Sequence, residues 1–244
     1  MGCRLGGVAT TCTLNMDWLS PSGGAIWHLR ALRYRRHWGP FLHAIEQWLD
    51  AWQHGKRHLL LLGPSAGWCL PSAFLARFES IHAVDLDPWV PHLFALRHGK
   101  ALRRAGTRIT WQRADFFLHA KDLLNQHREH AVLFPNVLGQ HALHVSDSSV
   151  AERDLAKLVM RLRGRAWASF HERLSGRLAD AQPDLQTREL PGRLSAEALA
   201  QRIAMTGVWS DHSTTDVFPA ECPRLLLAWV FRPGHVHWIE AAHP

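Results

Sequence analysis

The chain has 244 residues, of which 47% are hydrophobic and 20% are charged. This composition excludes a wholly disordered chain, and the length is enough to bury a core in one large domain or two small ones. No uncharged apolar run approaches the ~20 residues that span a bilayer, so a transmembrane protein is excluded.

The net charge of +7 suggests an acidic partner, but only four of the 28 basic residues are lysines and the arginines are dispersed. The one cluster comprises Arg30, Arg33, Arg35 and Arg36. A nucleic-acid footprint is usually clustered. We therefore expect a small-molecule partner rather than nucleic acid, and no membrane partner.

The four cysteines, Cys3, Cys12, Cys69 and Cys222, form no C-x-x-C pair. Their spacing indicates neither a disulfide framework nor a zinc site, so we expect no metal and a cytoplasmic location. Residues 1–16 are small and polar without an apolar run, and we expect them to be disordered. The sequence leaves open whether translation starts at Met1 or Met16, and it leaves the oligomeric state open.

Residues 17–54 are predicted to form a helical N-terminal accessory segment, or lid. Apolar positions 41, 45, 48, 49 and 52 follow one face of a helix, with Pro40 near its start and Gly55 after its end.

From residue 55 to 244, short apolar runs alternate with helical patterns, which predicts one α/β domain with a doubly wound, mostly parallel sheet and helices on both faces. The strand-like runs are 58–62, 80–85, 108–112, 131–134 and 165–170, and the helical spans are 69–78, 88–104, 117–128, 148–163 and 195–205. The runs 207–217 and 224–231 are predicted to form an antiparallel strand pair at the sheet edge.

A turn of small residues follows the first strand and precedes a helical span. Gly63 and Gly67 allow the backbone to turn tightly and approach a ligand. Asp85 ends the second strand 18 residues after Gly67, close to the ~20-residue offset of ribose-binding carboxylates. Asp115 follows the third strand. The dinucleotide and Walker fingerprints are both absent.

These residues resemble the class I S-adenosylmethionine-dependent methyltransferases, a superfamily with a Rossmann-like fold. Gly63, Ser65 and Gly67 resemble its first motif, with Ser65 in place of the central glycine. The resemblance implies S-adenosyl-L-methionine as cofactor and a methyltransferase with an unidentified, small-molecule acceptor. It implies that the following residues bind the cofactor or line the methyl-transfer site: Gly63, Ser65, Gly67, Asp85, Leu86, Asp115, Phe116 and Asn136.

Two further readings of the sequence stay open. Gly63 to Gly67 is also a G-x-S-x-G sequence, so Ser65 could be the nucleophile of a serine hydrolase, with Asp211 or Asp216 and His235 or His237. Alternatively, the chain could be a catalytically degenerate binding protein of the methyltransferase fold, or an RNA methyltransferase. His141, just after the fourth strand, is the candidate catalytic base.

Overall fold

A computed structural model describes residues 24–145, 147–177, 185, 187–190 and 192–244. The segment 1–16, which we expect to be disordered, lies outside the described residues, as do the first residues of the predicted accessory segment. In the described part of the chain, no helix is long and apolar enough to cross a membrane.

A single mixed sheet organises the fold, with strand order β3-β2-β1-β4-β5-β9-β8-β6 and with β7 paired to β5. The first five strands are parallel, and β9 runs antiparallel to both β5 and β8. The order of the strands runs from β1 to β3 toward one edge of the sheet and from β4 onward toward the other. This reversal of strand order creates a switch point at the carboxyl ends of β1 and β4. The strands are β1 His58–Leu62, β2 Ser80–Asp85, β3 Arg108–Arg113, β4 Ala131–Pro135, β5 Trp167–Arg177, β6 Arg188–Leu190, β7 Trp209–Asp211, β8 Arg224–Arg232 and β9 His235–Ala242.

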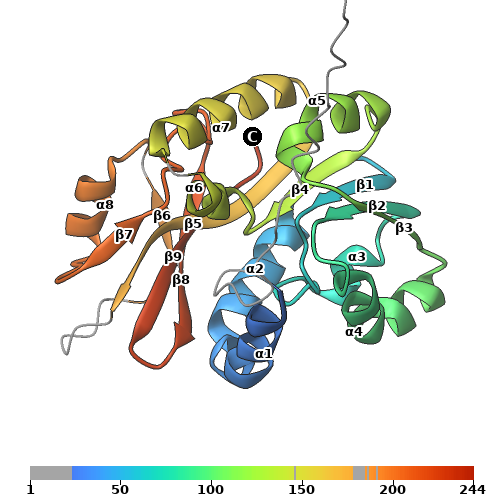
Figure 1. Ribbon diagram of the computed structural model, residues 1–244, viewed down its shortest axis with the longest axis horizontal. Coiled ribbons are helices and arrows are strands. Elements are labelled where there is room, and N and C mark those ends of the chain that lie inside the picture. Colours follow the sequence, from blue (N-terminus) through green and yellow to red (C-terminus); the bar gives the residue numbers. More distant parts are fainter. Residues whose placement is uncertain (1–23, 146, 178–184, 186, 191) are drawn as a thin grey trace, which may run out of the picture.

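Helices cover both faces of this sheet (Figure 1). On one side lie α2 Gly39–Ala51, α3 Ser72–Leu75 and α4 Val90–Ala105, with α1 Gly24–Tyr34 beside α2 and a short 3-10 turn, Arg35–His37, between them. On the other side lie α5 Phe116–Gln126, α6 His141–His144 and α7 Ser148–Leu162. The helix α8 Ala196–Arg202 lies near β6 and β7, and a 3-10 turn, Leu138–Gln140, precedes α6.

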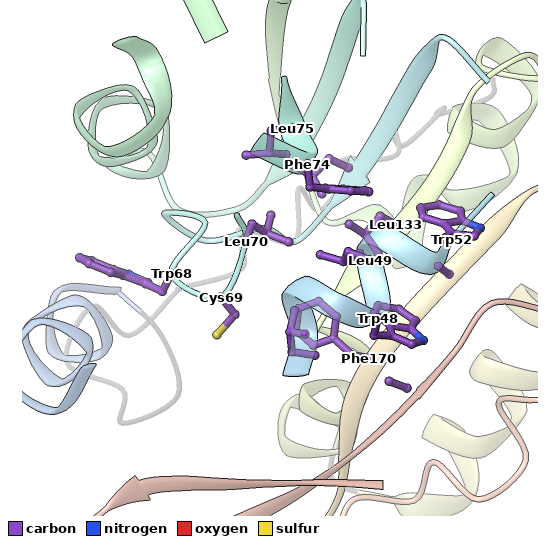
Figure 2. Close-up of a cluster of buried hydrophobic side chains, with 14 of the residues drawn as sticks. Trp48, Leu49, Trp52, Trp68, Cys69, Leu70, Phe74, Leu75, Leu133 and Phe170 are labelled. Atoms are coloured by element: carbon purple, nitrogen blue, oxygen red, sulfur yellow. The ribbon is translucent and has the colours of Figure 1, made fainter. Parts of the chain in front are cut away.

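The central strand β1 explains why the core has two layers. All four leucines from Leu59 to Leu62 are buried, and successive side chains of a strand point to opposite faces. Leu59 and Leu61 belong to the core beneath α2 and α4, whereas Leu60 and Leu62 belong to the core beneath α5 and α7. Figure 2 shows the first core, in which Trp48 and Leu49 of α2, and Trp52 just after it, lie near Leu133 of β4 and Phe170 of β5.

The structure corrects the predicted strand pair at the sheet edge. Only Trp209–Asp211 of the run 207–217 is a strand, and it pairs with β5 rather than with β8. Strand β8 pairs antiparallel with β6 and with β9, and β9 lies outside the strands predicted from the sequence. Polar residues interrupt the apolar pattern of β9. Glu240 is buried and His237 is half-buried, and each pairs with a charged group on another strand.

Candidate functional site

The turn after β1 has the backbone conformation that its glycines permit. Gly63, Ser65 and Gly67 have φ angles of 64°, 50° and 65°, a left-handed region that side chains disfavour. A Cβ atom on Gly63 would lie 2.4 Å from a methyl carbon of Val137. One on Gly67 would lie 2.5 Å from Nε2 of His98. Glycine is therefore required at both positions, because of the positive φ angle and because a side chain would collide with its neighbours.

Asp85 ends β2 beside this turn, and its carboxylate accepts backbone hydrogen bonds from both neighbouring segments. The Ser65 N–H donates to Oδ2 at 2.8 Å, and the Asp87 N–H donates to Oδ1 at 3.0 Å. Burial raises the pKa of Asp85 to about 6, against the two backbone donors, which favour the ionised form. The structure thus joins the glycine turn and the strand-end carboxylate that the sequence singles out.

The helix α1 is fastened over the turn by three side-chain contacts. Trp27 Nε1 donates to Ser65 Oγ at 2.9 Å, and His28 Nε2 lies 3.0 Å from Asp87 Oδ2. Trp68 Nε1 donates to His28 Nδ1 at 3.0 Å. Because Nδ1 accepts, Nε2 carries the proton that bonds Asp87. Figure 2 shows Trp68 projecting toward α1, at the margin of the core that it shares with α2.

Three of the other predicted cofactor residues, Leu86, Asp115 and Phe116, follow β2 and β3. Asp115 caps α5, where its side chain accepts from the Phe117 N–H at 2.9 Å. Phe116 is buried, and its ring centroid lies 5.8 Å from that of Phe134, so its side chain belongs to the core. The carbonyl of Leu86 accepts from Arg113 Nε at 3.1 Å.

A buried polar cluster joins Asn136, which follows β4, to Glu172 in the middle of β5. Asn136 Nδ2 donates to Glu172 Oε1 at 3.1 Å. His212 Nδ1 lies 3.2 Å from the other oxygen of Glu172, and His237 Nδ1 lies 3.1 Å from Oε1. Burial favours the neutral acid, but His237, His212 and Asn136 outweigh it and lower the pKa of Glu172 to about 2. The sequence signal was weak, since these residues lie far apart in the chain.

The predicted base His141 begins α6. Its Nε2 lies 3.4 Å from Asp154 Oδ2, and its ring stacks on Phe117 at 3.7 Å between centroids. These contacts lie beside the start of α5, next to Asp115 rather than within the Glu172 cluster.

The residues required by the hydrolase alternative do not come together. Ser65 Oγ accepts from Trp27, and within the described residues no histidine bonds it. Asp211 accepts from the Ser213 N–H, and Asp216 pairs with Arg193 at 3.1 Å. His237 lies against Glu172. Among the described residues, therefore, none of these candidates acts as a general base at Ser65.

Most backbone N–H groups of the turn already donate hydrogen bonds within the protein. Gly63 N–H bonds Val84 O, Ser65 N–H bonds Asp85, and Gly67 N–H bonds Pro64 O. Pro64 has no N–H. Asp85, in contrast, retains acceptor capacity, because each carboxylate oxygen accepts more than one hydrogen bond. Hydroxyl groups of a nucleoside therefore fit this site through Asp85 rather than through the turn's amides.

No family model matches the chain, and no curated protein matches it. Solved structures do. Magnesium protoporphyrin IX methyltransferase (ChlM) from Synechocystis PCC 6803, with bound S-adenosylhomocysteine (SAH), is 12% identical with a TM-score of 0.50, over 90% of this chain and 95% of that one. The N-methyltransferase NodS from Bradyrhizobium japonicum WM9, also with SAH, is 10% identical with a TM-score of 0.47, over 88% and 98%.

The first of these similarities covers most of both chains and shows the fold of the described residues, a mostly parallel sheet with the reversed strand β9. The described residues therefore have the fold of the class I S-adenosylmethionine-dependent methyltransferases.

Proposed function

We propose that the chain is an S-adenosylmethionine-dependent methyltransferase that acts on a small-molecule acceptor. One observation carries this proposal: the carboxylate of Asp85 lies at the end of β2 and bonds the turn of Gly63 to Gly67 through the Ser65 N–H. A carboxylate in this position accepts both ribose hydroxyls in nucleoside-binding α/β folds. The structure that is 12% identical holds SAH, the demethylated product.

In the proposed complex, the chain's own residues bind, orient and enclose. Asp85 accepts from the ribose, Leu86 packs on the adenine, and Asp115 accepts from its amino group. Trp27 holds α1 over Ser65, which excludes water from the turn. When bound, S-adenosylmethionine supplies an electrophilic methyl group on its sulfonium sulfur. Positioning then provides most of the rate enhancement, since methyl transfer is an in-line displacement.

Calorimetry with S-adenosylmethionine and with SAH tests the proposal directly. We expect saturable binding of both, and an affinity about 100-fold lower for Asp85→Ala, because two hydrogen bonds to a charged group are lost. Asp122→Ala, a change at an exposed carboxylate on α5, is the matched control and keeps wild-type affinity. Absence of heat and of any thermal shift with either ligand would overturn the proposal.

Labelling with a fluorophosphonate probe separately tests the serine hydrolase alternative. Labelling of the wild type that is lost in Ser65→Ala would favour the serine hydrolase. We expect no labelling, because Ser65 Oγ accepts from Trp27 and lacks a base.

A further inference from the structure

Asn136 occupies an unusual position directly after β4. Its φ angle is 60°, in the left-handed region, and its N–H donates to Phe170 O at 2.6 Å. The residue is only 6% exposed. A polar side chain held in this conformation and buried to this extent needs partners for both ends of its amide.

The amide of Asn136 has a partner at only one end. Its Nδ2 donates to Glu172 Oε1, and Glu172 is ionised because its histidine and amide neighbours lower its pKa to about 2. The reverse amide orientation would place Oδ1 against a carboxylate, so Glu172 fixes which atom is the oxygen. Among the described residues, no donor reaches Asn136 Oδ1, although the atom is buried. The site therefore presents an oriented hydrogen-bond acceptor without its donor.

This acceptor lies next to the proposed cofactor site. Val137, the next residue, packs against the position where Gly63 lacks a Cβ, and Gly139 lies against the backbone of Glu172. The chain thus connects Asn136 and Glu172 to the glycine turn through direct packing contacts.

Aromatic rings line the connection between the Glu172 cluster and α1. The ring of His237 lies 5.2 Å from that of Phe231 and 5.5 Å from that of Trp229. Phe231 in turn stacks on Trp27 at 5.7 Å, and Trp27 bonds Ser65. An acceptor held at Asn136 would meet the ionised carboxylate of Glu172, which favours a group with positive character.

We propose that Asn136 and Glu172 recognise an acceptor nitrogen that carries an N–H, so that the reaction is N-methylation of an amine. The N–H donates to Asn136 Oδ1, and the Glu172 carboxylate stabilises the charge that develops on nitrogen. This inference rests on the proposed function. A carboxylate or phenolate acceptor would be repelled by Glu172 and would offer no donor to Asn136.

The transfer balances with the cofactor as methyl donor. The nitrogen lone pair forms the new N–C bond while the C–S bond breaks, and its electron pair stays on sulfur as a thioether. The nitrogen becomes an ammonium cation beside the Glu172 carboxylate. It then loses its proton to water.

Calorimetry with benzylamine and benzoate, which share a ring but carry opposite charges, tests the recognition site. We expect benzylamine to bind the wild type at least about tenfold more tightly than benzoate. We expect Asn136→Gly to weaken benzylamine binding about tenfold, because one hydrogen bond to the ligand is lost. Glycine accepts a φ of 60° without strain, so this variant should fold. Glu172→Gln, which preserves the shape of the side chain, should remove the preference for benzylamine over benzoate.

Asn125→Ala, at an exposed asparagine of α5, is the matched control and should bind benzylamine as the wild type does. Three results would overturn the inference: no saturable benzylamine binding, benzoate binding as tight as that of benzylamine, or unchanged benzylamine affinity in Asn136→Gly. The titrations are run with and without SAH. A protein that selects benzylamine but does not bind SAH contradicts the proposed function alone. A protein that binds SAH without selecting benzylamine contradicts this inference alone.

Discussion

At the scale of single residues, the glycine turn combines a backbone requirement with a packing requirement. Gly63 and Gly67 have positive φ angles, and a methyl group on either would collide with a neighbouring side chain. Gly106, which ends α4, has a φ of 75° but no atom within 4 Å of its missing Cβ. Comparing the three positions separates the cost of the φ angle from that of the collision.

We expect Gly106→Ala to destabilise the fold by about 1 kcal/mol, the cost of the φ angle alone. Gly63→Ala and Gly67→Ala should cost about 2–4 kcal/mol, because Val137 or His98 must also move. Urea denaturation measures this difference. SAH affinity should fall in the two turn variants and stay at the wild-type value in Gly106→Ala. Equal losses of stability in all three variants would show that the collisions are relieved without cost.

The carboxylate of Asp85 makes ligand binding depend on pH. Burial raises its pKa to about 6, so the free protein loses the ionised form as the pH falls through 6. Hydroxyl groups donate more strongly to a carboxylate than to a carboxylic acid. We therefore expect SAH affinity to fall about tenfold from pH 7.5 to pH 5, because only about a tenth of Asp85 is ionised one unit below its pKa. Calorimetry across this range measures the change. Asp85→Asn should bind weakly with a flat pH profile, and a flat profile in the wild type would contradict the assignment of Asp85.

At the scale of elements, a buried ionic group joins the reversed strand β9 to its neighbours. Glu240 of β9 pairs with Arg173 of β5 and with Arg224 of β8, each at 3.0 Å. All three residues are at most 3% exposed. Burial raises the pKa of Glu240 against the pull of the two arginines. Each guanidinium also donates to other acceptors, including Thr215 Oγ1 at 2.6 Å from Arg173.

Replacing Glu240 would leave two buried guanidinium groups without their anion. We expect Glu240→Gln to destabilise the fold by about 3–5 kcal/mol, the usual cost of breaking a buried ion pair on one side. Glu152→Gln, at an exposed glutamate of α7, is the control and should be neutral within about 0.5 kcal/mol. Equal stability of the two variants would mean that β9 is held by its apolar contacts alone.

The buried ion pairs of Glu240 also show why some elements could be predicted from the sequence and others could not. The parallel strands β1 to β4 are apolar runs bounded by turns, and α2 repeats its apolar residues with helical spacing, so local patterns predict them. The predicted helix 69–78 is shortened to Ser72–Leu75, since Pro71 restricts the residue before it. His237 and Glu240 interrupt the pattern of β9, and their partners come from other strands. Likewise, the spacing to Asp85 is local, whereas Glu172 meets Asn136 and His212 only after folding.

At the scale of the whole molecule, the 18 histidines determine how the fold responds to acid. One group lies around the amino ends of the central strands, where the ring of His130 lies 4.6 Å from that of His127 and 5.3 Å from that of His58. Burial, followed by the neighbouring histidines, lowers the pKa of His130 to about 4. Burial is also the main reason why the pKa values of His98, beneath the turn, and of His235, on β9, are lowered to about 4.

These lowered values predict loss of stability in mild acid. Between pH 6.5 and 4 the unfolded chain binds protons at these histidines and the folded chain does not, so the free energy of unfolding falls as the pH falls. Asp85 and Glu240, whose pKa values are raised by burial, act in the opposite sense, but burial also lowers the pKa values of further histidines, namely His54, His127 and His171. We expect the melting temperature to fall by at least about 5 °C between pH 7 and pH 5. His130→Leu should reduce this pH dependence, and His119→Gln, at an exposed histidine of α5, should leave it unchanged. A melting temperature that stays constant over this range would mean that the buried histidines gain protons without unfolding the chain.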